Sequence, residues 1–129
     1  MNEIDRKEMV RLQLDRAERF MAQADKLLED QFYDLAANRY YYACYHAIQG
    51  LFIHDGLSCH THKGLHQMLG LNYVIKGKFD ARLSAFFRTM EQLREKADYN
   101  CVYDITKDEV VEMKQPSREI VALVQNMVS

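Results

Sequence analysis

The sequence predicts an all-α protein, a five-helix up-and-down bundle formed by one domain over residues 1–129. Only one proline and five glycines interrupt the chain, which favours long helices over many short strands. Apolar residues recur at spacings of three and four, the period of a helix with one buried face. Hydrophobic residues make up 48% of the chain, so a domain of this length can bury a core without metals or disulfides.

The first two helices are predicted from about Asp5 to Glu29 and from about Phe32 to Asp55. Residues 40–45 are apolar or aromatic on nearly every side, which is typical of the buried helix of a bundle. Gly56 is predicted to end this second helix, since glycine readily adopts the left-handed conformation common after a helix C-terminus. The first helix has a seam of apolar residues at alternating spacings of four and three: Val10, Leu14, Ala17, Met21, Ala24 and Leu28.

Three more helices complete the predicted bundle. Thr61 is the predicted N-cap of a shorter third helix that ends near Lys76. The fourth runs from about Asp80 to Tyr99, with apolar residues at helical spacing. Thr106 to Glu109 forms a capping-box pattern that begins the last helix, and Pro116 inside that helix is predicted to kink or split it.

The charge of the chain is unevenly distributed. The formal net charge is −2, which argues against a protein that binds nucleic acid through a global basic field. Residues 60–96, however, carry seven basic and three acidic side chains, a local charge of +4. An anionic ligand is therefore expected to meet the middle of the chain rather than either end.

The N-terminal sequence, the apolar runs and the cysteines indicate the cellular compartment to expect. The first residues lead directly into a charged amphipathic stretch, and no run approaches the roughly 20 apolar residues of a membrane span. The three cysteines form an odd set, which predicts free thiols in a reducing environment. We therefore expect a cytoplasmic protein with no membrane partner.

Two polar residues on the apolar second helix need an explanation. Arg39 and His46 are seven residues apart, so they lie within about 20° of the same helix face. An arginine keeps its charge and must find a carboxylate, carbonyl groups, water or an anionic ligand. One interpretation is a structural arginine paired with an acid and a core histidine with one hydrogen bond. The other is that both side chains serve a ligand.

Arg94 and Asp98 form a second candidate pair near the end of the fourth helix. They are four residues apart, which fits either a solvent-exposed ion pair or a planar phosphate donor that Asp98 holds in place. Spacing alone does not decide between these two interpretations.

Cys59, His60, His62 and His66 form the only cluster with metal-ligand character. His62 and His66 are four apart on one helix face, a possible zinc pair with Cys59 as a third ligand. The cluster lacks the paired Cys-x-x-Cys spacing of a strong zinc motif, so we expect neither a metal nor another cofactor. Glycine-rich phosphate loops and Gly-x-Ser-x-Gly elbows are also absent.

Three blocks of sequence resemble one family. Residues 37–47, with Arg39, Tyr41, Tyr42 and His46, resemble the "R-x-Y-Y-A-x-x-H-A" core of HEPN domains (higher eukaryotes and prokaryotes nucleotide-binding). Residues 61–65 are similar to the "T/S-H-x-G" helix start of a bacterial and archaeal subgroup, and residues 94–99 to its "R-x-x-A-D-Y" signature. The resemblance covers roughly residues 32–103, and the blocks come in the order of the family.

The resemblance implies a small all-α bundle that commonly forms a homodimer. Many such proteins are encoded with a minimal nucleotidyltransferase, and the two form a toxin–antitoxin pair. Toxic members are metal-independent endoribonucleases with an "R-x(4–6)-H" motif. The histidine there would deprotonate a ribose 2′-OH, and the arginine would stabilise the phosphorane. In this chain Tyr99, not histidine, stands five residues after Arg94.

The leading functional hypothesis is therefore a binding module. It would bind a nucleotide or a nucleotidyltransferase partner, and a tyrosine of that region, Tyr99 or Tyr103, would be a target of nucleotidyl transfer. The first alternative is an endoribonuclease that cleaves RNA, with Arg94 on the phosphate and His46, or His62, moving the proton. The second alternative is a plain helical protein-interaction domain. The binding surface of the leading hypothesis consists of Arg39, His62, Arg94, Asp98 and Tyr99.

Overall fold

The computed structural model describes all residues 1–129 and contains helices only. Their order is α1 (Glu3–Glu29), α2 (Tyr33–His54), α3 (His62–Leu69), the short π-helix η1 (Gly70–Val74), α4 (Ala81–Tyr99) and α5 (Lys107–Val128). The predicted all-α bundle is confirmed.

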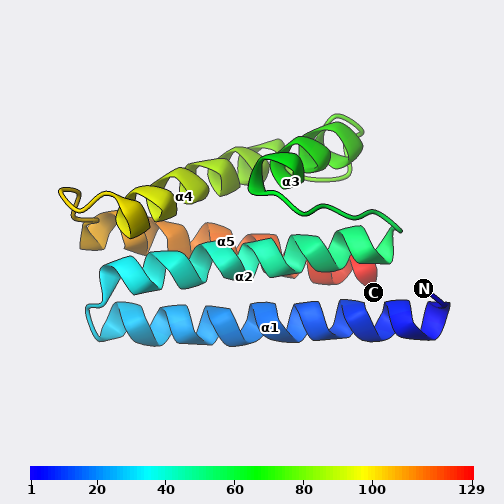
Figure 1. Ribbon diagram of the computed structural model, residues 1–129, viewed down its shortest axis with the longest axis horizontal. Helices are drawn as coiled ribbons and strands as arrows, with labels where there is room; N and C mark the ends of the chain where they lie inside the picture. The colour runs from blue at the N-terminus through cyan, green and yellow to red at the C-terminus, as the bar shows by residue number, and fades with distance from the viewer.

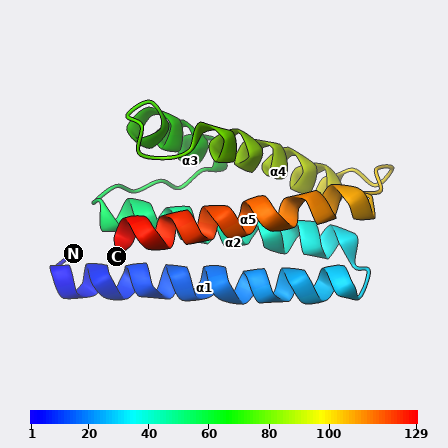
Figure 2. The same ribbon diagram turned by 180° about the vertical axis from the view of Figure 1, so that it is seen from behind.

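The helices pack around α2. Helices α1 and α2 form a long antiparallel pair, α5 lies along both, and α4 crosses over α2 and α5 with α3 beside it (Figure 1). The view from behind shows α5 in front of α2, with α1 on one side and α4 on the other (Figure 2). Helix α2 supplies ten apolar residues of the core, and Tyr40 and Tyr41 are fully buried, as the pattern of residues 40–45 predicts.

Local signals begin and end the helices as predicted. The Thr106 side chain accepts a hydrogen bond from the Glu109 N–H while the Glu109 side chain accepts one from the Thr106 N–H, a complete capping box. Thr61 caps α3 by accepting from the Gly64 N–H. Gly56 and Gly77 have φ angles of +77° and +74°, the left-handed conformation that favours glycine.

The third predicted helix is shorter than expected. Helix α3 ends at Leu69, and the chain widens into η1, where the Ile75 N–H donates to the Gly70 carbonyl. This wider turn leaves Tyr73 buried, with its ring stacked on Phe52 at 5.6 Å and its hydroxyl donating to Asp55. The tertiary anchor of Tyr73 therefore ends the regular α-helix before Lys76.

Pro116 does not split the last helix. Helix α5 runs through it without a break, so that alternative of the prediction is wrong. A proline removes one hydrogen bond of the helix, but Met113 and Ser117 on either side are fully buried and hold the segment against the core.

All three cysteines are free thiols, as predicted.

Candidate functional site

The candidate site is centred on Arg94, a charged side chain of α4 that is only 5% exposed. Its guanidinium lies over the rings of Tyr41 and Tyr42, 5.2 and 5.4 Å from their centroids. Both rings come from α2, because the apolar face of that helix packs against α4. Cation–π contact with two rings offsets part of the cost of burying the charge.

The polar contacts of Arg94 are incomplete. Its NH1 group donates to the Asp98 carboxylate at 3.3 Å, so the predicted pair forms, but between a buried guanidinium and a carboxylate at the surface. The Nε–H is buried and has no hydrogen-bond partner. A buried donor without an acceptor costs free energy, and such groups are rare in folded proteins.

Two histidines of α3 meet the same tyrosine. The Tyr41 hydroxyl lies 2.9 Å from Nδ1 of His62 and 3.4 Å from Nε2 of His66. Nε2 of His66 is also 3.0 Å from Oε2 of Glu91, a residue of α4. Burial, with a smaller contribution from Arg88 and His62, lowers the pKa of His66 to about 4.

His62 is the accessible member of this group. Its side chain is 36% exposed, whereas that of His66 is 5% exposed. Since Tyr41 holds Nδ1, the other ring nitrogen of His62 is left for a ligand. We call Tyr41, Tyr42, His62, Glu91 and Arg94 the Arg94 cluster.

Arg39 is linked to this cluster through neighbouring polar groups. Its NH1 group donates to Oδ1 of Asn38 at 2.6 Å, and Nδ2 of Asn38 donates to Asp98 at 3.3 Å. The Nε–H donates to Gln23 of α1, and the guanidinium lies 4.8 Å above the ring of Phe20. Amides and an aromatic ring, not a carboxylate, therefore satisfy this charge.

His46 faces α1. Nδ1 lies 2.9 Å from Oε1 of Gln13, and the ring meets Phe20 edge-on at 5.2 Å. Burial, with a smaller contribution from Arg16 and Arg19, lowers its pKa to about 4. Arg39 and His46 thus share Phe20, as their predicted common helix face requires, but the structure does not bring His46 into contact with Arg94.

Tyr99, the last residue of α4, and Tyr103, in the loop that follows, differ in the hydrogen bonding of their hydroxyl groups. Tyr99 is 78% exposed and its hydroxyl forms no hydrogen bond. It borders a shallow hollow of about 560 Å³ that Lys96 and Asn100 also line. The hydroxyl of Tyr103, in contrast, donates to Glu109, and that bond raises the pKa of Tyr103 to about 12.

Comparison with known proteins identifies the family. The sequence model described as "HEPN domain" matches residues 10–127. The chain belongs to the HEPN domain family. The fold agrees, since the crystal structure of ST0689, an archaeal HEPN homologue, superposes with a TM-score of 0.75 at 17% identity. That match covers 93% of this chain and 98% of the other.

Relatives of this HEPN domain include two putative toxins and a UPF0332 protein. "Putative toxin MJ0142" of Methanocaldococcus jannaschii is 24% identical over 74% of this chain, and the match spans only 65% of that protein. "Putative toxin MJ0605" of the same organism is 30% identical over 74% of this chain and 71% of its own length. A UPF0332 protein of Archaeoglobus fulgidus is 25% identical over 92% and 94%.

Several residues of the HEPN domain's Arg94 cluster are not among the site residues predicted from the sequence. Tyr41 and Tyr42 read as core residues, and Glu91 reads as a surface carboxylate, although it lies three residues before Arg94 on the same face of α4. That spacing is the one local signal for Glu91. Asn38, which joins Arg39 to Asp98, is likewise unmarked in the sequence.

The structure does not gather Cys59, His60, His62 and His66 into a metal-binding group. The Cys59 thiol donates to the Thr61 carbonyl, and His60 is exposed. No group of three or more His, Cys, Asp or Glu side chains has the arrangement of a metal site. Separately, none of the helices is both long and apolar enough to cross a membrane.

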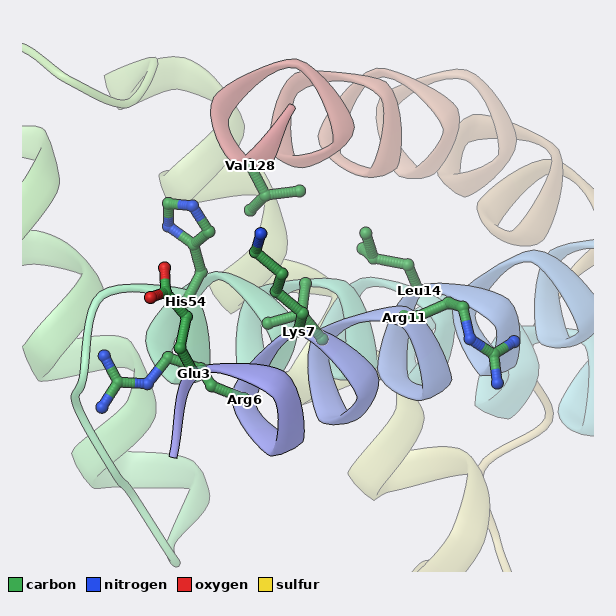
Figure 3. A pocket seen from close by; sticks show the side chains of 8 residues that line it. Glu3, Arg6, Lys7, Arg11, Leu14, His54 and Val128 are labelled. Carbon is green, nitrogen blue, oxygen red and sulfur yellow. The ribbon is translucent and has the colours of Figure 1, made fainter. Parts of the chain in front are cut away.

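A second hollow, of about 710 Å³, lies at the other end of the HEPN domain, where α1 begins. In Figure 3 the amine of Lys7 and the ring of His54 point toward Val128, whereas the guanidinium groups of Arg6 and Arg11 point outward to opposite sides. Glu8 and Asp15 hold Arg11 in ion pairs. These cations do not converge on one point, and no predicted site residue lies here.

Proposed function

We propose that this HEPN domain is the toxin-type component of a toxin–antitoxin pair and binds a minimal nucleotidyltransferase through the end of α4. Two relatives that bear the name putative toxin support the general class. The observation that carries the proposal is the side chain of Tyr99, 78% exposed with an unbonded hydroxyl, directly after Asp98, the ion-pair partner of the buried Arg94.

Tyr99 is the acceptor in this proposal. The phenolic oxygen attacks the α-phosphorus of a nucleoside triphosphate held by the partner, and a new P–O bond forms. The bond to the pyrophosphate leaving group breaks, and the phenolic proton passes to a base of the partner. An exposed hydroxyl can enter the partner's active site without unfolding of α4.

Tyr103 is the poorer acceptor. Its hydroxyl must first leave Glu109, and a phenol whose pKa is raised to about 12 gives up its proton less readily. The same reasoning excludes Tyr41, whose hydroxyl is buried between His62 and His66.

Asp98, Arg94 and Arg39 hold the end of α4 in place in this proposal. The chain of hydrogen bonds from Arg94 through Asp98 and Asn38 to Arg39 ties α4 to α2 at the turn that precedes Tyr99. His62, with one ring nitrogen unbonded, adds a group that can contact the nucleotide or the partner.

Coexpression with a minimal nucleotidyltransferase of the same organism tests the proposal. We expect the two chains to copurify and the HEPN domain to gain the mass of one nucleotidyl group. Tyr99→Phe should abolish this adduct without loss of copurification, while Tyr103→Phe, the matched control, should keep it. Absence of copurification, or an adduct on Tyr99→Phe protein, contradicts the proposal.

A metal-independent endoribonuclease is the second candidate function. The observation that favours it is that His62 and Arg94 meet around Tyr41, so a base and a cation lie at one site despite the missing late histidine. A polar groove of about 460 Å³ between α3 and α4, with Lys63 and Arg88 on its rim, adjoins this site through His66 and Glu91. Such a groove suits an RNA backbone.

Growth after induction of the chain alone tests this second function. Arrest that Arg94→Ala and His62→Ala both relieve, at equal soluble expression, supports the ribonuclease, and mapping of cellular RNA ends then locates the cuts. Unimpaired growth with the unmodified chain contradicts it.

A further inference from the structure

The end of the bundle that carries Tyr99 also contains a hollow of about 450 Å³. It lies between the α1–α2 turn and the α4–α5 loop, two segments far apart in sequence that meet at one end of the molecule (Figure 1). Tyr33 and Asp34 line one wall, and Cys101 and Asp104 line the other. Asn100 lines both this hollow and the one beside Tyr99, so the two lie on either side of one residue. We call it the end hollow.

Large apolar side chains flank the end hollow without cover. Val102 is 88% exposed and Phe32 is 54% exposed. Each is a sequence neighbour of lining residues, Val102 of Cys101 and Phe32 of Tyr33. Exposed apolar side chains beside a concave surface are typical of protein–protein contact sites, since their burial stabilises a complex.

The charge around the end hollow is strongly negative. The two segments that form it, residues 26–35 and 96–109, contain seven carboxylates and three lysines, a formal charge of −4. Asp30 is paired with Lys26, and Asp98 with Arg94, but Asp34 and Asp104 have no ion pair. Such a field repels the phosphates of nucleic acid and attracts cations. A basic partner surface is therefore the complementary one.

We infer that the end hollow is the docking surface for a basic segment of the nucleotidyltransferase partner. A large apolar side chain of that segment enters the hollow between Phe32 and Val102, and flanking Lys or Arg side chains face Asp34 and Asp104. The inference rests on the proposed function, because docking here places the partner beside Tyr99. The inference also separates two roles at this end of the bundle: residues of the end hollow bind the partner, and Tyr99 accepts the nucleotidyl group.

Charge reversal tests this assignment on the complete chain. We expect Asp34→Lys/Asp104→Lys to weaken binding of the copurifying nucleotidyltransferase by roughly tenfold or more, as the loss of close charge pairs does. Higher salt should weaken binding of the unmodified chain but not of this variant. Val102→Ser, which removes the apolar contact without a change of charge, should weaken binding independently.

The matched control is Glu3→Lys/Asp5→Lys. It makes the same change of charge in the first turn of α1, at the opposite end of the bundle, just as Asp34 lies in the first turn of α2. Circular dichroism and thermal melts of all variants establish that each is folded. The control should bind as the unmodified chain does.

The outcomes separate the two proposals. Binding of the unmodified chain together with unchanged binding of both end-hollow variants overturns this inference and leaves the proposed function intact. No binding of the unmodified chain overturns both. Weaker binding of the end-hollow variants, with full binding of the control and of Tyr99→Phe, supports the inference.

Discussion

The Tyr41 hydroxyl lies 2.9 Å from Nδ1 of His62 and joins α2 to the first turn of α3. This bond matters because α3 follows an extended loop and sits to one side of the bundle (Figure 1). The same tyrosine ring supports the Arg94 guanidinium from α4. A single residue of α2 therefore positions groups from two other helices.

Tyr41→Phe should separate these two roles. The ring that supports Arg94 stays, while the hydrogen bond to His62 is lost, which we expect to cost about 1 kcal/mol of unfolding free energy. Urea denaturation measures this cost. Tyr42→Phe is the control, since its hydroxyl forms no hydrogen bond in the structure, and a similar loss in that variant would contradict the assignment.

Arg94→Met should preserve the fold better than Arg94→Ala. Methionine fills most of the space of the buried side chain and keeps its packing against the two tyrosine rings, whereas both substitutions leave Asp98 without its ion pair. Alanine leaves a cavity beside Tyr41 and Tyr42, at an expected cost of about 2 kcal/mol or more. Both variants should lose the site's activity. Activity retained in Arg94→Met would show that the guanidinium has only a structural role.

The stability of the protein should fall as pH decreases from about 6.5 toward 4. Burial holds the pKa of His46 and His66 at about 4, below the value of about 6.5 in an unfolded chain, so the unfolded state binds more protons in this range. The two histidines should contribute alike, because Arg16 and Arg19 add to the effect of burial at His46 as Arg88 and His62 do at His66.

Denaturant midpoints at pH 7 and pH 5 measure this dependence. His46→Gln keeps a polar group near Gln13 but cannot titrate, so the difference between the two midpoints should shrink. His60→Gln, at an exposed histidine with no hydrogen bond or ion pair, is the control and should leave that difference unchanged. An equal difference in His46→Gln and the unmodified chain would contradict the prediction.

Helix ends and turns could be predicted from sequence because their causes are local. Thr106 and Glu109 form the capping box within four residues, and Gly56 and Gly77 supply the left-handed turns. The end of α3 could not be predicted in this way. Tyr73 stacks on Phe52, about twenty positions away, and that tertiary contact accompanies the change to a π-helix.

The same distinction between local and tertiary causes applies to the candidate site. The pairing of Arg94 with Asp98 and the shared face of Arg39 and His46 follow from helix periodicity alone. Periodicity does not say which neighbour a face meets. It therefore gives no sign that Arg94 lies over Tyr41 rather than in solvent, or that His66 meets Glu91.

Gly64→Ala should destabilise the start of α3, where His62 lies. A Cβ atom there would stand 2.7 Å from Oγ1 of Thr61 and 3.0 Å from the Cys59 sulfur, too close for either. Thr61 would then lose its capping bond to the residue 64 N–H, an expected cost of about 1 kcal/mol. Gly70→Ala is the matched control, because a Cβ at that helical position meets no atom within 4 Å and should stabilise the protein slightly. The melting temperatures of the two variants should therefore shift in opposite directions. Because His62 begins α3, Gly64→Ala should also impair any activity that depends on His62. Equal melting temperatures in the two variants would show that the Thr61 cap does not hold α3 in place.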